Sequence, residues 1–111
     1  MTVSVDQVQN GIISYIEREI APQASSVKKF GIYFAMPLIR NKIPHYLATA
    51  RSIAPELFDD AGNIDIDKTY NMAKDAIRRS GQVVFMGIIF NETDVDKLYS
   101  HMRPASTSSP Y

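Results

Sequence analysis

Apolar residues recur every three or four positions through most of this chain, which is the period of an amphipathic helix. The clearest run extends from Val5 to Ile20. It follows Ser4 and Gln7, which have the spacing of a capping box, in which each side chain satisfies a backbone donor at a helix start. Pro22 interrupts the pattern. The spacing therefore predicts a first helix that begins after Ser4 and ends before Pro22.

Prolines divide the next stretch of the pattern. A second helix is predicted to begin at Ser25 or Ser26, and Pro37 within it predicts a kink or a restart, because proline lacks a backbone N–H. Pro44 suits the first turn of a third, short helix. Nearly every position from Phe30 to Ile39 is apolar. We expect that segment to be buried, either as the central helix of the fold or against another subunit.

The second half of the pattern opens with a turn and a capped helix. Residues 59–63 read Asp-Asp-Ala-Gly-Asn, which is turn chemistry. Asp65 or Asp67 can cap the helix that follows, and Gly81 stands where a helix C-terminus commonly places glycine. A last helix is predicted to open at Thr93.

The segment Gln82 to Phe90 has an ambiguous pattern. It is an apolar run rich in β-formers and predicts a buried strand or a short hairpin that pairs near residues 63–66, with a buried helix as the alternative. The elements together predict a mainly α fold, a compact bundle of about five helices with one short strand or hairpin near residues 82–90. Residues 1–103 are expected to form a single domain, followed by a mobile tail at residues 104–111.

Composition narrows the possible functions. The 111 residues include twelve basic and twelve acidic side chains, so the net charge is zero. A neutral chain is not typical of a general nucleic-acid binder, which neutralises phosphates with basic residues. It also lacks the net charge that would make two copies repel each other. The absence of cysteine excludes disulfides, cysteine-ligated metals and thiol nucleophiles. The sequence has neither a signal peptide pattern nor a run long enough to span a bilayer. We expect a soluble, cytoplasmic protein with no membrane partner.

No catalytic or cofactor motif stands out in the sequence. There is no glycine-rich phosphate loop and no nucleophile elbow. The two histidines, His45 and His101, have no second ligand at a helical spacing of three or four residues, so we expect no metal site. The sequence therefore predicts a protein that is not an enzyme and carries no cofactor.

One basic and aromatic set could hold an anion. Arg40 and Lys42 precede Pro44, and His45 and Tyr46 follow it at the expected start of the third helix, where free N–H groups favour a phosphate. The alternative is an ordinary solvated face. The candidate anion-binding residues are Arg40, Lys42, His45, Tyr46 and Arg51, with a second basic patch at Arg78 and Arg79.

The apolar and aromatic residues of the two segments 30–39 and 83–90, set against zero net charge, predict self-association. The candidate interface residues are Phe30, Tyr33, Phe34, Met36, Val84, Met86 and Ile88.

Residues 58–102 carry a resemblance to known sequences. It rests on the words Phe-Asp at 58–59, Gly-Asn-Ile-Asp-Ile-Asp at 62–67, Tyr-Asn-Met-Ala-Lys at 70–74, Gly-Gln at 81–82 and Phe-Asn-Glu-Thr-Asp-Val-Asp-Lys-Leu-Tyr at 90–99. This part resembles small uncharacterised helical proteins of phage and prophage genes in Firmicutes. The resemblance implies an accessory protein of the host cytoplasm that acts by binding: it blocks a host factor, sequesters a defence signal or assists virion assembly.

The leading hypothesis from the sequence is therefore a non-enzymatic, homo-oligomeric binding protein. A nucleotide- or nucleic-acid-binding module is the alternative.

Overall fold

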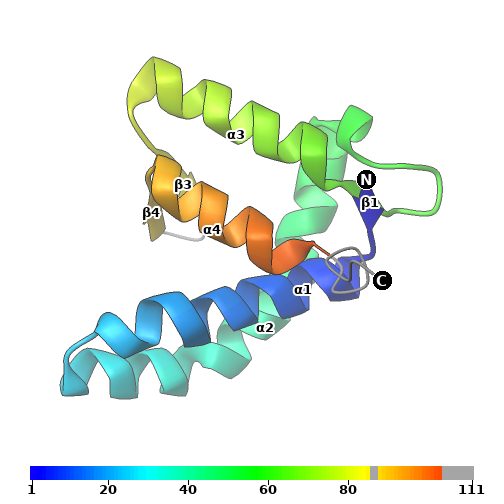
Figure 1. Ribbon diagram of the computed structural model, residues 1–111. Helices are drawn as coiled ribbons and strands as arrows, with labels where there is room; N and C mark the ends of the chain where they lie inside the picture. The colour runs from blue at the N-terminus through cyan, green and yellow to red at the C-terminus, as the bar shows by residue number, and fades with distance from the viewer. Residues whose placement is uncertain (86–87, 104–111) are drawn as a thin grey trace, which may run out of the picture.

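The computed structural model describes residues 1–85 and 88–103, so the predicted tail at 104–111 lies outside the described residues. The mainly helical class is confirmed (Figure 1), but these residues form four α-helices where the pattern predicted about five. Two short antiparallel strand pairs accompany them. The α-helices are α1 (Val5–Tyr15), α2 (Ser26–Ile53), α3 (Ile66–Ser80) and α4 (Glu92–Met102).

Local capping rules explain most helix ends. The Ser4 hydroxyl accepts a bond from the Gln7 N–H at 3.1 Å, and the Gln7 side chain accepts from the Ser4 N–H at 2.8 Å. The Asp65 carboxylate accepts two backbone N–H bonds at the start of α3, and Gly81 ends that helix with a φ of 85°. The capping predictions at these residues are confirmed. After Tyr15, α1 continues as a π-helical turn (Ile16–Ile20, η1) and a 3₁₀ turn (Ala21–Gln23, η2).

The last helix begins earlier than predicted. Asn91 is the N-cap of α4: its side chain accepts from the Asp94 N–H at 2.9 Å, and the Asp94 carboxylate accepts from the Asn91 N–H at 3.0 Å. Thr93 lies inside the helix. The prediction of Thr93 was wrong because threonine is also a good cap, and only the reciprocal bonds select asparagine.

The predicted second and third helices are one continuous helix, α2, with Pro37 and Pro44 inside it. Each proline removes an N–H and so leaves the carbonyl four residues earlier without its helical donor. For Pro44 that carbonyl belongs to Arg40, and it accepts a bond of 2.8 Å from the Gln9 side-chain amide of α1. For Pro37 it belongs to Tyr33, a half-exposed residue. The helix continues through both prolines.

The segment 82–90 contains the predicted hairpin. Strand β3 (Val83–Phe85) pairs antiparallel with β4 (Ile88–Phe90). Its predicted pairing near residues 63–66 was wrong, because β2 (Ile64–Asp65) is paired with β1 (Thr2–Val3) at the other end of the chain. A 3₁₀ turn (Pro55–Leu57, η3) leads from α2 towards β2 and places Leu57 in the core.

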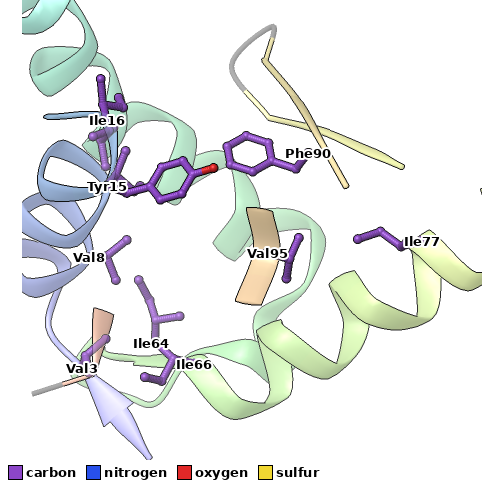
Figure 2. Packing of buried hydrophobic residues seen from close by; sticks show 11 residues of the cluster. Val3, Val8, Tyr15, Ile16, Ile64, Ile66, Ile77, Phe90 and Val95 are labelled. Atoms are coloured by element: carbon purple, nitrogen blue, oxygen red, sulfur yellow. The ribbon is translucent and has the colours of Figure 1, made fainter. Parts of the chain in front are cut away.

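Helix α1 is the centre of the packing. It contacts α4 on one side and the first half of α2 on the other, so that α1 and α2 form a two-helix arm with α3 beyond α4 (Figure 1). Gly11 allows the close approach of α1 to α4, since a Cβ there would lie 3.1 Å from the His101 carbonyl oxygen. The buried Tyr15 ring stacks on Phe90 at 5.9 Å (Figure 2).

Candidate functional site

The most exposed apolar surface lies along the first half of α2. Val27, Phe30, Phe34 and Leu38 follow one another at spacings of three and four residues, so they share one helix face. Their exposed fractions are 84, 72, 75 and 62%. The rings of Phe30 and Phe34 stack with centroids 6.3 Å apart. We call this set the α2 stripe. Tyr33, half exposed, lies beside it.

The opposite face of α2 packs on the core. Ile43 is fully buried, and Ile32, Met36, Ile39 and Leu47 pack against the buried cluster. The helix is therefore apolar on two faces, of which only one is covered. The expectation that residues 30–39 form a central buried helix was wrong, because α1 and the turns that follow it pack on one face of α2 and leave the stripe exposed.

Charge is unevenly divided between α2 and the rest of the chain. Helix α2 carries five of the twelve lysine and arginine residues and none of the twelve aspartate and glutamate residues. Its net charge is therefore +5, and that of the remaining sequence is −5. With 3.6 residues per turn, Lys28 and Lys42 border the α2 stripe on one side, and Arg40 borders it on the other, beyond Tyr33. The stripe is an apolar band between two cationic margins.

Because α2 is continuous, the predicted anion site lacks the helix start on which the prediction depended. No helix begins at Pro44, so the free N–H groups that favoured an anion beside His45 and Tyr46 are not available. The positions of Arg40 and Lys42, two residues apart, point to different flanks of the helix. The fold thus spreads these side chains over α2 and leaves a cationic surface in place of a converging pocket.

The remaining basic candidates have structural partners. Arg51 donates to the Asp60 carbonyl oxygen at 3.5 Å and lies against Gly62, so it packs on the turn at 59–63. Arg79 forms an ion pair with Asp75 one helical turn earlier on α3. Arg78 is exposed in the last turn of the same helix. No contact joins Arg78 or Arg79 to α2 among the interactions of the described residues.

A second feature, which the sequence pattern did not indicate, is an apolar cavity of about 290 Å³. The cavity is open to solvent on one side, and an apolar hollow that faces water is a place where an apolar group can be buried. It is lined by Val8, Ile12, Leu47, Ile64, Ile66, Thr69, Tyr70, Ala73, Val83, Val84, Phe90, Val95, Leu98, Tyr99 and Met102.

Two tyrosines on the wall of the cavity turn their hydroxyls outward. Tyr70 donates to Asp96 at 2.6 Å, and Tyr99 donates to Asp67. Their rings stack with centroids 4.3 Å apart. Because both hydroxyls are bound to carboxylates, the two tyrosines line the cavity with their rings alone, and its surface stays apolar.

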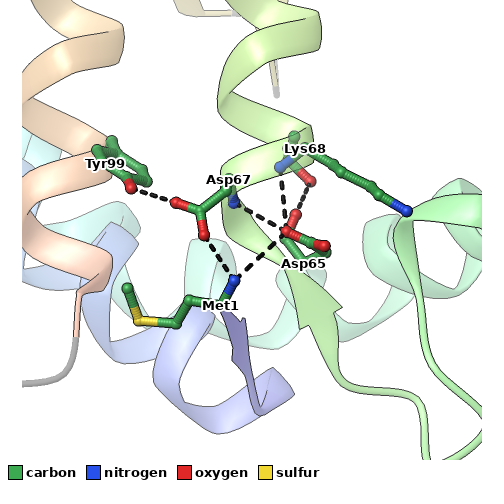
Figure 3. Close-up of polar contacts among 6 residues, drawn as sticks. Met1, Asp65, Asp67, Lys68 and Tyr99 are labelled. Atoms are coloured by element: carbon green, nitrogen blue, oxygen red, sulfur yellow. Dashed lines mark hydrogen bonds and ion pairs between the residues drawn. The ribbon is translucent and has the colours of Figure 1, made fainter.

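The same carboxylates tie the neighbouring elements together. Asp67 also accepts a bond of 2.6 Å from the Met1 ammonium, which with the Tyr99 bond lowers the pKa of the Asp67 carboxyl (Figure 3). Hydrogen bonds from Tyr70 and then from Lys74 lower the pKa of Asp96. Burial, together with the nearby Asp94 carboxylate, raises the pKa of Tyr15 to about 12. The bonds to Asp67 and Asp96 thus hold the two tyrosines of the cavity wall in place.

The cavity reaches solvent beside α3 and β3, because its lining residues Thr69 and Val84 are exposed. Val84 is a predicted interface residue, and it borders this opening. Of the other two candidates in the hairpin, Met86 and the side chain of Ile88 lie outside the described residues. The structure therefore separates the predicted interface residues into two places, the α2 stripe and the mouth of the cavity, while Met36 packs on the core.

The two histidines occupy different environments. His45 is exposed on α2, but His101 is half-buried, with Nδ1 3.2 Å from the Ser14 hydroxyl and Nε2 3.6 Å from a Glu19 carboxylate oxygen. His101 differs from His45 because α4 packs against α1. Within residues 1–85 and 88–103, no three acidic or histidine side chains gather in a way that could hold a metal ion.

Comparison with known proteins does not assign this site. No family model, no curated protein and no solved structure matches the chain. Over the part of the chain that is described, no helix combines the length and hydropathy needed to cross a membrane.

Proposed function

We propose that this protein is a non-enzymatic binding protein that works as a homo-oligomer, and that the α2 stripe is its contact surface. The observation that carries the proposal is the exposure of Val27, Phe30, Phe34 and Leu38 on one helix face. Monomeric soluble proteins rarely leave a contiguous apolar band of this kind uncovered. The resemblance of residues 58–102 to small phage and prophage proteins supports the same class of function, including a role in assembly or in blocking a host factor.

Aromatic composition supports the stripe as the energetic centre of an interface. Phenylalanine is enriched in the buried core of protein interfaces, and a few such residues usually dominate the binding energy. Two stacked phenylalanines within the first three turns of α2 fit that pattern.

The test compares three proteins by sedimentation velocity over a wide concentration range. They are the wild type, Phe30→Ser with Phe34→Ser, and the control Ile53→Ser. Ile53 is as exposed as the phenylalanines and lies on the same helix, but it is outside the stripe. The proposal predicts that the wild type and the control self-associate and that the double variant stays monomeric. A wild type that remains monomeric at the highest concentration contradicts it.

A second candidate function is favoured by one observation, the absence of acidic residues from α2. Five cations along one helix could follow a phosphate backbone. This candidate predicts that a mixed-sequence DNA duplex binds with an affinity that falls steeply as salt rises, and that Arg40→Ala weakens it. Binding that is absent, or independent of salt, removes the candidate.

A further inference from the structure

We infer that the α2 stripe of one copy inserts its two phenylalanine rings into the apolar cavity of a second copy, giving a head-to-tail contact. The inference rests on the proposed function, since it names the surface that the stripe meets. It connects two features of the described residues: exposed aromatic rings on the first half of α2, and an apolar cavity lined by the four helices and both strand pairs.

Size is the first argument for this pairing. An apolar cavity of about 150 Å³ accommodates one benzene ring, so the cavity of about 290 Å³ accommodates roughly two. The stripe presents two rings, those of Phe30 and Phe34, already stacked against each other. At about 200 Å² for a whole aromatic side chain, their present exposure leaves roughly 300 Å² available for burial.

Position within the chain is the second argument. The stripe lies on the face of α2 opposite Ile43, which is buried against the core. Figure 1 shows α1 between the first half of α2 and α4. Because the buried face of α2 is the one that packs on the core, the exposed stripe faces away from the core that holds the cavity. The rings of one chain can therefore enter only the cavity of another.

Charge is the third argument, and it decides between two kinds of self-contact. If the stripe met the stripe of another copy, the cationic margins of both helices would come together with no acidic residue on either. Like charges at an interface are unfavourable. In the head-to-tail contact, α2 meets α1, α3, α4 and the strand pairs of a second copy, which together carry seven acidic and five basic residues. The cations of α2 then have carboxylates within the partner surface, which a second α2 does not offer.

A head-to-tail contact uses two different surfaces, so each copy can bind two others. Assembly therefore continues beyond the dimer unless the copies close into a cyclic oligomer. This property allows a complementation test. One variant lacks the rings, Phe30→Ser with Phe34→Ser, and keeps the cavity. The other keeps the rings but has a filled cavity, Ala73→Phe, since Ala73 lines it. Circular dichroism and the melting temperature of each variant establish that it is folded.

The inference predicts that each variant alone is monomeric, with association weakened by about thirtyfold or more, the effect of losing one interface hot spot. An equimolar mixture of the two forms a heterodimer and nothing larger, because only one ring surface and one open cavity remain. If Ala73→Phe fails to fold, Val84→Lys replaces it. Val84 is exposed at the mouth, and lysine there repels the cationic margins of the stripe.

The outcomes separate this inference from the proposed function. If the cavity-filled variant self-associates like the wild type while the ring-less variant does not, the stripe meets another stripe; the inference then fails and the proposed function stands. If the mixture stays monomeric although both variants are folded and the wild type associates, the inference also fails. If the wild type never associates, both fail.

Discussion

Substitution of two glycines by alanine tests the α1–α4 contact on which the cavity depends. Gly11 in α1 and Gly31 in α2 are both helical, and alanine is favoured over glycine in a helix interior by about 1 kcal/mol. Their surroundings differ. A Cβ on Gly31 meets nothing within 4 Å, whereas a Cβ on Gly11 lies 2.9 Å from the Met102 Cγ and 3.1 Å from both the His101 carbonyl oxygen and the Met102 Cα.

The Met102 side chain can shift, but the two backbone atoms of α4 cannot move without displacing the helix. Overpacking of this kind costs about 1–3 kcal/mol. Against the propensity gain of about 1 kcal/mol, Gly11→Ala is therefore expected to destabilise by about 0–2 kcal/mol, while Gly31→Ala stabilises by about 0.5–1 kcal/mol. The difference between the two variants is about 1–3 kcal/mol.

Thermal unfolding followed by circular dichroism measures this difference. For a domain of this size, 1 kcal/mol corresponds to about 4 °C in melting temperature. We expect Gly31→Ala to melt above the wild type and Gly11→Ala to melt at or below it, by several degrees relative to Gly31→Ala. Equal stabilisation of both variants would refute the close packing of α1 on α4, and with it the shape of the cavity that Met102 lines.

Three further predictions concern stability, each measured by urea denaturation. Ile43→Ala removes a fully buried side chain and is expected to lower the free energy of unfolding by about 2–5 kcal/mol. Ile53 is 78% exposed, so Ile53→Ala is expected to change that free energy by no more than about 0.5 kcal/mol. Equal effects of the two substitutions would contradict the orientation of α2. Gln9→Ala leaves the Arg40 carbonyl without its donor and is expected to cost about 1 kcal/mol, and an unchanged midpoint would show that the bond does not support the helix at its second proline. The pKa of Asp96 is lowered by the hydrogen bonds from Tyr70 and then Lys74, so ionised Asp96 contributes fully to the free energy of unfolding above the ordinary carboxyl range near pH 4, and this contribution is lost as the pH falls through the lowered pKa. Asp96→Asn is therefore expected to make the free energy of unfolding less dependent on pH in the acid range. The same pH dependence in the variant and the wild type would refute this role.

The sequence predicted features whose causes are local. The capping box at Ser4, the carboxylate cap at Asp65 and the left-handed glycine at Gly81 each depend on residues within one helical turn. The turn at 59–63 was predictable for the same reason, since the Asp59 carboxylate accepts the N–H groups of Ala61 and Asn63.

Features decided by distant residues were not predictable. Pro44 breaks a helix on local rules, but here α2 continues through it, and the carbonyl of Arg40 that it leaves without a helical donor accepts a bond from Gln9, 31 residues earlier. The pairing of β1 with β2 joins strands of two residues each from distant parts of the sequence. Such short strands have no periodicity from which a prediction could start.

The candidate site shows the same division. Phe30 and Phe34 were predicted to be interface residues because the segment around them has more apolar residues than one buried helix face needs. Which face of α2 would be covered depends on where α1 packs, and the helical period alone does not determine that. The cavity has no sequence signature at all, because its lining comes from helices α1 to α4 and both strand pairs.

Native mass spectrometry of the purified wild-type protein at low and high concentration tests the central claim most directly. Self-association through the α2 stripe predicts oligomers that grow with concentration and that contain only this chain. A single monomeric species at every concentration would contradict it, and an added mass of a small apolar molecule on that monomer would assign the cavity to a ligand in place of a second copy.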